Sequence, residues 1–416
     1  MIPGQDDGID VTILMPCLNE STTLEQCVET AKAALRELEG LGLSGEILIS
    51  DNGSTDGSLE LAERLDCRVV HCPRRGYGNA LIHGSLEARG RYIVMGDADA
   101  SYDFREGVPM VLKLKDGHDL CMGNRFAGTI KPGAMPWKNR YLGNPVLSGV
   151  LNIFYRSGLR DAHCGLRAFT KDAFLKMRLT SGGMEFASEM VVKAALLKLK
   201  CTEVPITLHP DGRGREPHLR PWRDGWRHLK YLFMLSPFWL YFIPSAILIL
   251  LSVFVFTALL LTPPGKVFAL GPLWFGDHWI ILAGGLFTIG YGGIIYGLAA
   301  FVASVQQRYR IISQRLSDLY NRIVTVENAL ALGSILVLAG LGIFVYVLVV
   351  WKSRDFGALS KLREMVIATT LVVCGVQTVF GGFLLSFLGE AEAEDLAVGY
   401  DEGCASDDCA DSARPQ

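Results

Sequence analysis

Two aspartates, Asp97 and Asp99, directly follow a short apolar run, 91–95, that predicts a buried strand. In open α/β sheets, ligands bind beyond the carboxyl ends of the strands, so both carboxylates would stand where a ligand binds. Carboxylate oxygens are the ligands that Mg and Mn prefer, and these ions commonly arrive with a diphosphate. The pattern therefore predicts a metal site for a diphosphate at Asp97 and Asp99. An isolated Asp-x-Asp would more simply be a solvated acidic turn. Whether these two residues form a metal site therefore depends on the motifs in the rest of the chain.

Polar loops also follow two other predicted strands, and each contains a carboxylate. Glu20 closes the loop after the strand at 11–15, and Asp51 opens the loop after the strand at 46–50. A carboxylate at a strand end can accept hydrogen bonds from a nucleobase or a ribose hydroxyl. Asp51 would equally suit an Asx turn that supports the residues after it. Gly76 and Gly78, taken alone, are more often a strand-to-helix turn than a phosphate cradle.

Strands and helices alternate through the first half of the chain, which predicts an α/β fold with a parallel sheet. The run 127–137 is rich in Gly and Pro and predicts a mobile loop. The predicted strands are 11–15, 46–50, 68–72, 91–95 and 119–122, and the predicted helices begin near Ser21, Leu59, Gly76, Leu142 and Gly183.

Four motifs in order resemble glycosyltransferase family 2, which has a GT-A (Rossmann-like) fold. They are Pro16-Cys17-Leu18-Asn19-Glu20, Asp51-Asn52-Gly53-Ser54-Thr55-Asp56-Gly57, Arg75-Gly76-Tyr77-Gly78-Asn79-Ala80 and Gly96-Asp97-Ala98-Asp99. Within the family the chain looks most like the polyprenyl-phosphate (dolichyl- or undecaprenyl-phosphate) hexose synthases. A further run, Asp161-Ala162-His163-Cys164-Gly165-Leu166-Arg167, is similar to a later motif of the same group.

The resemblance implies roles for individual residues. Donor binding falls to Pro16, Leu18, Glu20, Asp51, Gly76, Asp97, Ala98 and Asp99, with Asp97 and Asp99 also holding Mg or Mn. The reacting centre would include Asp97, Asp99, Arg125 and Asp161. Many relatives carry Gln two residues after the second Asp, where this chain has Ser101. Asp103 would take part instead, or would simply cap the helix that follows it.

Basic residues beyond the acidic motif are candidates for binding an acceptor phosphate. The candidates are Arg125, Lys138, Arg140, Arg167, Arg215, His218 and Arg220. Lys138 and Arg140 would also suit the wet side of an ordinary amphipathic core helix, which composition alone favours for Lys138. The basic loop 209–220 would equally anchor the chain beside anionic lipid head groups.

The second half of the chain is apolar and predicts an α-helical transmembrane domain. Half of all residues are hydrophobic and the mean hydropathy is +0.28. Four runs, 238–262, 279–305, 328–351 and 365–388, are each long enough to cross a bilayer core of about 30 Å. We therefore predict a GT-A domain at 1–218, an interfacial amphipathic helix at 219–236, a membrane domain at 237–389 and a disordered acidic tail at 390–416. Four crossings place the basic loop 352–364 outside, against the positive-inside trend.

The expected activity uses both the predicted GT-A domain and the predicted membrane domain. The resemblance implies an inverting, metal-dependent enzyme that moves a hexose from a nucleotide sugar to a polyprenyl phosphate in the membrane. The run 96–103 resembles the glucose-type synthases more than the mannose-type, which implies UDP-glucose as donor, with GDP-mannose as the alternative. The four apolar runs predict a multi-pass protein of the cell membrane. The N-terminus is polar and lacks the pattern of a signal peptide, which predicts that the GT-A domain lies in the cytoplasm. A homo-oligomer is possible, and no nucleic-acid partner is expected.

Two other functions would use a similar architecture. A processive polysaccharide synthase of the same family would carry Gln-x-x-Arg-Trp before its later spans, and Gln306-Gln307-Arg308-Tyr309-Arg310 is not that motif. A sugar-lipid transporter or scaffold with an inactive transferase domain would not need both Asp97 and Asp99. The ten Cys contain no Cys-x-x-Cys pair, so zinc is not expected.

Overall fold

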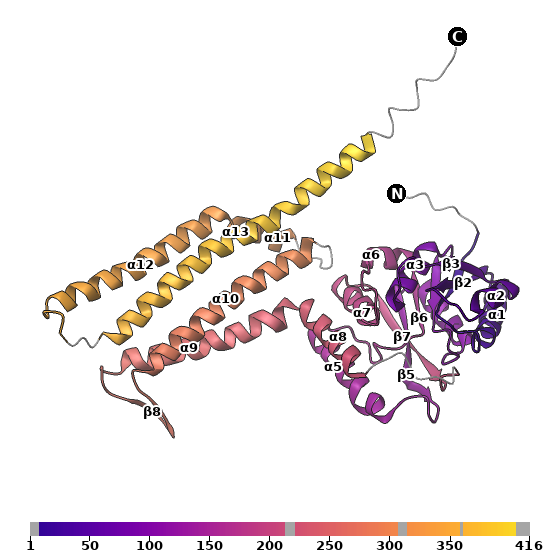
Figure 1. Ribbon diagram of the computed structural model, residues 1–416, viewed down its shortest axis with the longest axis horizontal. Helices are drawn as coiled ribbons and strands as arrows, with labels where there is room; N and C mark the ends of the chain where they lie inside the picture. Colours follow the sequence, from indigo (N-terminus) through magenta and orange to yellow (C-terminus); the bar gives the residue numbers. More distant parts are fainter. Residues whose placement is uncertain (1–7, 213–220, 307–313, 358–360, 405–416) are drawn as a thin grey trace, which may run out of the picture. The chain divides into compact units, whose positions relative to one another are not determined.

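The computed structural model describes residues 8–212, 221–306, 314–357 and 361–404 (Figure 1). The chain forms two compact units that divide between Leu235 and Ser236. We call Met1–Leu235 the α/β unit and Ser236–Gln416 the helical unit. The division falls one residue before the boundary that the sequence predicts between its interfacial helix and its membrane domain.

The α/β unit is built around a seven-stranded sheet in the order β3-β2-β1-β4-β6-β5-β7. Parallel pairing joins β1 to β2 and β4, β2 to β3, and β5 to β7, whereas β6 runs antiparallel to β4 and β5. The α/β fold is confirmed, and two strands, β6 and β7, were missed. The strands are β1 (Val11–Cys17), β2 (Gly45–Asp51), β3 (Arg68–His71), β4 (Tyr92–Met95), β5 (Leu120–Ile130), β6 (Arg167–Thr170) and β7 (Cys201–Leu208).

Helices cover the sheet because their apolar residues recur at helical spacing. In α1 the buried positions are Leu24, Cys27, Val28, Ala31, Ala34 and Leu38, which form one face. α1 contacts α4, while α3 contacts α7, so two helical layers enclose the central strands. The bounds are α1 (Leu24–Gly40), α2 (Ser58–Arg64), α3 (Tyr77–Glu87), η1 (Phe104–Gly107), α4 (Val108–Lys115), η2 (Asn139–Gly143), α5 (Asn144–Tyr155), α6 (Lys171–Met177), α7 (Phe186–Leu196) and α8 (Pro221–Met234).

The predicted mobile loop at 127–137 begins too early, because β5 continues to Ile130. Thr129 and Ile130 pair with Thr207 and Leu208 of β7 after an irregularity in register. Gly128 permits this, since a Cβ there would lie 2.0 Å from the carbonyl oxygen of Ile206. The sequence gives no sign of the partner strand, so the glycine was read as a loop residue.

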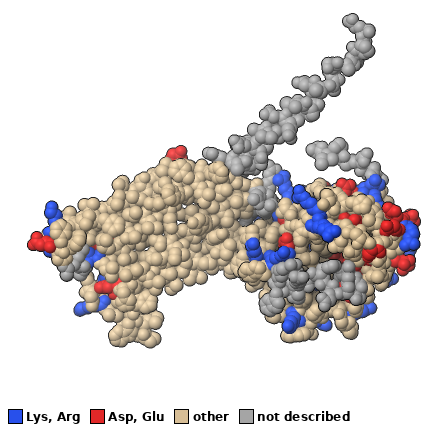
Figure 2. Space-filling model, in the orientation of Figure 1, with Lys and Arg blue, Asp and Glu red and all other residues tan. Residues whose placement is uncertain are grey.

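The helical unit contains four helices that are long and apolar enough to cross a membrane, within the described residues. Figure 2 shows that the visible face of this unit has few charges over most of its surface. The unit consists of η3 (Phe238–Phe242), α9 (Ile243–Leu261), β8 (Phe268–Leu270), β9 (Leu273–Phe275), α10 (Trp279–Gln306), α11 (Gln314–Ile323), α12 (Val326–Lys352) and α13 (Leu362–Cys404).

The basic segment before α13 carries charges that are partly neutralised. Arg363 donates to Asp277 and also to the carbonyl oxygens of Leu259 and Thr262, at the end of α9. Lys361 pairs with Glu364 at 2.6 Å. These contacts put the start of α13 at the same end of the unit as the end of α9. Two of the four basic residues at 352–364 are therefore paired with carboxylates. The conflict with the positive-inside trend stays, because that trend counts Lys and Arg and gives Asp and Glu little weight.

The last helix, α13, continues to Cys404, and the disordered tail expected at 390–416 stays a prediction. The run 390–398 contains Ala, Glu, Leu and no Gly or Pro, so its helix propensity is high despite its charge. Residues 405–416 lie outside the described residues.

A buried ion pair fixes the loop between α6 and α7. Glu189 and Lys193 are both fully buried and lie 2.6 Å apart. Glu189 also accepts hydrogen bonds from the backbone nitrogens of Thr180 and Ser181, and Lys193 donates to the carbonyl oxygen of Arg178. Burial alone would raise the pKa of Glu189, but the hydrogen bonds from Lys193 and Ser181 hold it below its ordinary value. The pair therefore holds residues 178–181 against α7.

Replacing Glu189 tests this anchor. Glu189→Ala leaves the Lys193 ammonium buried without its carboxylate, which costs about 3–5 kcal/mol. We expect the melting transition of the α/β unit, measured by calorimetry of the full-length protein in detergent, to fall by roughly 10 °C. Glu29→Ala, on the exposed side of α1, is the control and should shift it by about 1 °C or less. Equal melting of both variants would show that the ion pair does not stabilise the unit.

Candidate functional site

A cavity of about 450 Å³ opens at the carboxyl ends of β1, β2 and β4. Seven of the eight predicted donor-binding residues line the cavity. The eighth, Asp51, does not line it, although its neighbour Asn52 does. The lining residues are Pro16, Cys17, Leu18, Glu20, Asn52, Arg75, Gly76, Tyr77, Ala80, Asp97, Ala98, Asp99 and Met184. Residues from loops that are distant in sequence thus meet at one sheet edge.

Asp97 lies between a tyrosine and a glycine. The Tyr77 hydroxyl donates to Asp97 Oδ1 at 2.9 Å. Burial and the neighbouring Asp97 raise the pKa of Tyr77 well above its ordinary value, so the phenol stays protonated and remains a donor. On the other side, a Cβ at Gly165 would lie 2.5 Å from Asp97 Oδ2. The orientation of this carboxylate is therefore fixed by α3 and by the loop 161–165.

Asp99 is buried and is held by the residue that departs from the family pattern. Ser101 donates to Asp99 Oδ1 from its backbone nitrogen at 3.0 Å and from its hydroxyl at 2.5 Å. Ala100, between them, has a φ of 62°, so the chain turns sharply at this point. Ser101 thus contacts the second aspartate directly, whereas Asp103 caps η1 by accepting from the Arg105 backbone nitrogen.

Backbone contacts from two other elements hold the acidic loop. The Thr23 hydroxyl, at the start of α1, donates to the carbonyl oxygen of Ala98 at 2.7 Å. Gly212 donates its backbone N–H to the carbonyl oxygen of Asp99 at 3.0 Å. The aspartates therefore do not depend on their own loop alone for position.

The two carboxylates suit a divalent cation that brings other ligands with it. Within the described residues, no group of three or more His, Cys, Asp and Glu gathers as a metal site. A Mg-type site needs no such group, because this ion is usually bound by one or two carboxylates, with water and substrate phosphates completing the shell. Two oriented carboxylates beside a cavity fit that pattern.

The loop after β2 is fixed by its own polar residues. Asp51 accepts hydrogen bonds from the backbone nitrogens of Gly53 and Ser54, which is the Asx turn considered above. Burial raises the pKa of Asp51, but those hydrogen bonds and His71 hold it below its ordinary value overall. Asn52 then joins this loop to the next one, donating to the carbonyl oxygen of Arg74 and accepting from the Gly76 nitrogen at 2.7 Å.

Gly76 and Gly78 are required by a close backbone approach. A Cβ at Gly76 would lie 2.2 Å from the carbonyl oxygen of Gly182, and one at Gly78 would lie 2.0 Å from that of Ser181. The Asn79 nitrogen also donates to the Gly182 carbonyl oxygen. The loop fixed by Glu189 and Lys193 therefore packs on the start of α3, beside the cavity.

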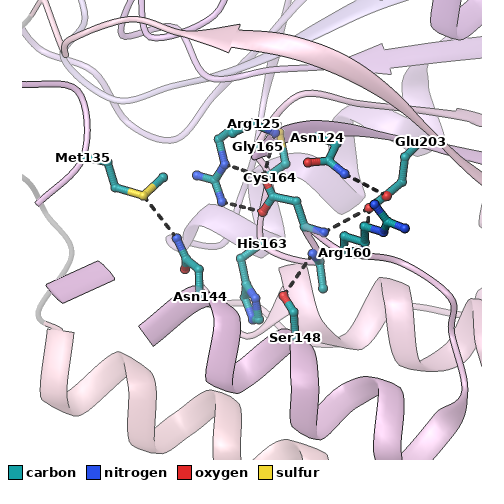
Figure 3. A network of polar contacts seen from close by, with 12 residues as sticks. Asn124, Arg125, Met135, Asn144, Ser148, Arg160, His163, Cys164, Gly165 and Glu203 are labelled. Atoms are coloured by element: carbon teal, nitrogen blue, oxygen red, sulfur yellow. Dashed lines mark hydrogen bonds and ion pairs between the residues drawn. The ribbon is translucent and has the colours of Figure 1, made fainter. Parts of the chain in front are cut away.

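Arg125 and Asp161 are bound to each other. Arg125 Nε and Nη2 each lie 2.7 Å from an Asp161 oxygen, and the Arg125 nitrogen donates to the same carboxylate at 3.0 Å. Asp161 is fully buried and Arg125 is 8% exposed. Figure 3 shows Arg125 reaching toward this loop beside Cys164 and Gly165. The pair positions the loop 161–165, and neither residue lines the cavity.

Arg167 is also used inside the protein. Its guanidinium donates to the carbonyl oxygens of Cys164, Ala187 and Ala162, and burial lowers its pKa. The predicted phosphate contact has no support in this geometry, because the side chain is 1% exposed. The sequence pattern showed an arginine near the motif but could not show which oxygens it meets.

The other predicted acceptor residues divide into two groups. Lys138 and Arg140 are exposed, and the nearby apolar side chains are exposed too. This ridge, which we call the η2–α5 ridge, includes Trp137, Tyr141, Leu142, Val146 and Ile153, which are 51–68% exposed. The exposure of Lys138 and Arg140 fits both interpretations of these two residues, whereas the exposed apolar side chains beside them are unusual for the wet side of an amphipathic helix. Arg215, His218 and Arg220 lie outside the described residues.

Six of the cavity residues are not among the ligand contacts that the sequence predicts. These are Cys17, Asn52, Arg75, Tyr77, Ala80 and Met184. The first five stand inside motifs that were noted, so only their individual contacts were missed. Met184 comes from the loop before α7, and no strand-end pattern indicates that this loop returns to the cavity.

Comparisons with known proteins agree with this arrangement. Residues 12–178 match the family model "Glycosyl transferase family 2", and residues 298–389 match "Glycosyltransferase family 2 C-terminal transmembrane region". The chain is 37% identical over 382 residues to the low-salt glycan biosynthesis hexosyltransferase Agl6 of Haloferax volcanii, covering 91% of this chain and 89% of that protein. The chain belongs to glycosyltransferase family 2.

Two further similarities are more limited than this one. Glycosyltransferase AglJ of the same organism is 35% identical to the transferase over 218 residues, which cover 52% of this chain and 68% of AglJ. A solved glucosyl-3-phosphoglycerate synthase of Mycobacterium tuberculosis, in complex with Mn2+, UDP and glucosyl-3-phosphoglycerate, is 18% identical with a TM-score of 0.41, and the match covers 55% of this chain and 78% of that one. The family matches and the four membrane-length helices among the described residues show that the transferase combines an α/β domain of family 2 with a multi-pass transmembrane region.

A methyl group at Gly78 tests the packing beside the cavity. Gly78→Ala would place its Cβ against the backbone of Ser181 and Gly183, which cannot move as a flexible side chain can. We expect the affinity of the full-length protein for a nucleoside diphosphate with Mn2+, measured by calorimetry, to fall by about tenfold, or about 1.4 kcal/mol.

Gly40→Ala is the matched control, because no atom lies within 4 Å of a Cβ at that position. It should leave the affinity unchanged. Unchanged binding in Gly78→Ala as well would show that the contact between the start of α3 and residues 181–183 does not shape the site.

Proposed function

We propose that the transferase moves a hexose from a nucleotide sugar to a polyprenyl phosphate, producing a polyprenyl-phosphate hexose for glycan biosynthesis. The observation that carries this proposal is the meeting of Glu20, Asp97 and Asp99 in one cavity of a protein with four membrane-length helices. A water-soluble donor and a membrane lipid can both be reached by such a chain. The hexosyltransferase Agl6, similar over most of its length, supports hexose transfer in a glycan pathway.

Donor binding is assigned to the cavity. Pro16, Leu18 and Glu20 would contact the nucleoside, with Asp51 shaping the neighbouring loop through its turn. Asp97 and Asp99 would hold Mg or Mn together with the diphosphate. Gly76 lets the start of α3 lie close to the backbone of Gly182. When bound, the metal would stabilise negative charge on the departing diphosphate. UDP-glucose is the proposed donor, and GDP-mannose is the alternative.

The acceptor needs no strong general base from the protein. A phosphate monoester, whose second pKa is about 6, is already largely dianionic at neutral pH. One of its oxygens would form a bond to the anomeric carbon as the bond to the nucleoside diphosphate breaks, with inversion. Asp161 is committed to Arg125 in this structure, which agrees with a reaction that requires orientation and charge neutralisation instead.

The η2–α5 ridge supports a lipid acceptor. Exposed aromatic and aliphatic side chains beside Lys138 and Arg140 are typical of a surface that contacts a membrane. We assign Lys138 and Arg140, with Arg215, His218 and Arg220, to the approach of the lipid phosphate. We also propose that the α/β unit lies in the cytoplasm and that α8 lies at the membrane surface. The Arg125–Asp161 pair and Arg167 are assigned to positioning the loop 161–165.

A donor panel tests the proposed reaction. Purified full-length protein, polyprenyl phosphate and Mn2+ or Mg2+ are incubated with labelled UDP-glucose, GDP-mannose and other nucleotide sugars, and the lipid product is identified by mass spectrometry. We expect one hexose per lipid from UDP-glucose, and loss of at least about 100-fold in rate for Asp97→Asn and Asp99→Asn. A lengthening polymer would indicate a processive synthase, and no lipid-linked sugar from any donor would contradict the proposal.

Ser101 provides a more specific test of the metal site. Ser101→Ala removes the hydroxyl that lies 2.5 Å from Asp99 Oδ1. Loss of a hydrogen bond to a metal-binding carboxylate typically costs about 10–100-fold in metal affinity. We expect the Mn2+ concentration for half-maximal transfer to rise by that factor. Ser44→Ala, which removes another serine-to-aspartate hydrogen bond, to Asp10, is the control and should change nothing. An unchanged Mn2+ requirement in Ser101→Ala would contradict the assigned metal site.

A further inference from the structure

Three polar side chains from three different elements form a buried chain beside the loop 161–165. His163 Nε2 lies 3.1 Å from Ser188 Oγ, and Ser188 Oγ lies 2.8 Å from His228 Nδ1. The two imidazole rings meet edge to face with centroids 5.0 Å apart. Ser188 and His228 are buried in α7 and α8, and His163 belongs to the loop. The proposed reaction gives no role to this chain of contacts.

At one end of this chain of polar contacts, His163 belongs to the loop 161–165, which borders the candidate site. Arg125 and Arg167 already hold this loop, and Gly165 lies directly against Asp97. Burial, together with the charges of His228, Arg167 and Arg125, lowers the pKa of His163 well below its ordinary value. His163 is therefore a neutral ring whose Nε2 contact to Ser188 fixes one side of the loop.

At the other end of this chain of polar contacts, His228 belongs to α8, which directly precedes the helical unit in the sequence. α8 ends at Met234 and the first membrane-length helix begins at Phe238. Only three residues, 235–237, separate these two helices in the sequence. On α8, Trp226, Lys230 and Met234 recur every four residues on the exposed side, while His228 and Leu232 face inward. An exposed Trp-Lys-Met face suits the membrane–water interface.

We propose that the His163–Ser188–His228 chain couples α8 to the loop 161–165, so that the loop takes its active position when α8 is seated on a membrane surface. This inference rests on the proposed function, because it assigns a regulatory input to the same site. The consequence is that the rate of donor turnover depends on how α8 contacts the membrane surface. Ser188 and His228 are thus positioning residues, and they do not contact the reacting groups.

A double-mutant cycle tests the coupling in full-length protein reconstituted in lipid nanodiscs. Trp226→Glu disturbs the outer face of α8, and Ser188→Ala breaks the chain in the middle. We expect each to lower kcat by about tenfold, and the double variant to be no slower than Ser188→Ala alone, because a broken chain cannot transmit the position of α8. His228→Phe should behave like Ser188→Ala, which keeps the test available if one variant folds poorly.

The matched control removes a different contact of the same helix. The Tyr155 hydroxyl on α5 donates to the carbonyl oxygen of Leu232 in α8, a hydrogen bond that does not involve the loop 161–165. Tyr155→Phe should leave kcat within about twofold, and Trp226→Glu should keep its full effect in that background. The proposal would be overturned if the double variant lost kcat by the product of the two single losses. It would also be overturned if Tyr155→Phe lowered kcat as much as Ser188→Ala does.

Hydrogen exchange separates failure of this inference from failure of the proposed function. Amide exchange at 161–165 is measured by mass spectrometry without any substrate, so it does not require the correct donor. We expect Trp226→Glu to speed exchange there in the wild-type background and to add nothing in Ser188→Ala. Absence of transfer from every donor would contradict the proposed reaction alone. Unchanged exchange in Trp226→Glu would contradict the coupling even if transfer occurs.

Discussion

The site depends on how two carboxylates are oriented at the end of β4. Tyr77 donates to Asp97 and Ser101 donates twice to Asp99, so each carboxylate is held in place by a neighbour. Thr23 and Gly212 hold the backbone between and after them. A metal and a diphosphate gain most from carboxylates that do not need to reorganise on binding. The remaining loops of the α/β unit are arranged around this preformed edge.

Buried charges act elsewhere in the unit as supports for the loops. Arg125 with Asp161 fixes the loop 161–165 against Asp97, and Lys193 with Glu189 fixes residues 178–181 near Gly78. Buried ion pairs add little net stability compared with apolar side chains of similar size, but removing one partner is costly. Such pairs therefore specify a loop conformation well. This explains why several charged residues near the site contact the protein itself and not the cavity.

The sequence was most informative where a strand ends in a polar loop. Glu20, Asp97 and Asp99 follow buried strands, so their meeting at one sheet edge could be predicted from alternation alone. The partners of Arg125, Asp161 and Arg167 could not, because pairing inside a fold depends on tertiary contacts that leave no local pattern. For the same reason β6 was not recognised, since an antiparallel strand of four residues has no distinctive periodicity. Ser101 was noted as a departure from the family, and the structure shows that it binds Asp99 directly.

The central claim is that Asp97 and Asp99 together anchor a divalent cation and the donor diphosphate. Electron paramagnetic resonance of Mn2+ in the full-length transferase, with UDP added, measures this directly through the coupling of the metal to phosphorus nuclei. The account predicts coupling to the diphosphate of UDP in the wild-type protein, and its loss in both Asp97→Asn and Asp99→Asn. Mn2+ that shows the same phosphorus coupling in the wild-type protein and in both variants would contradict it.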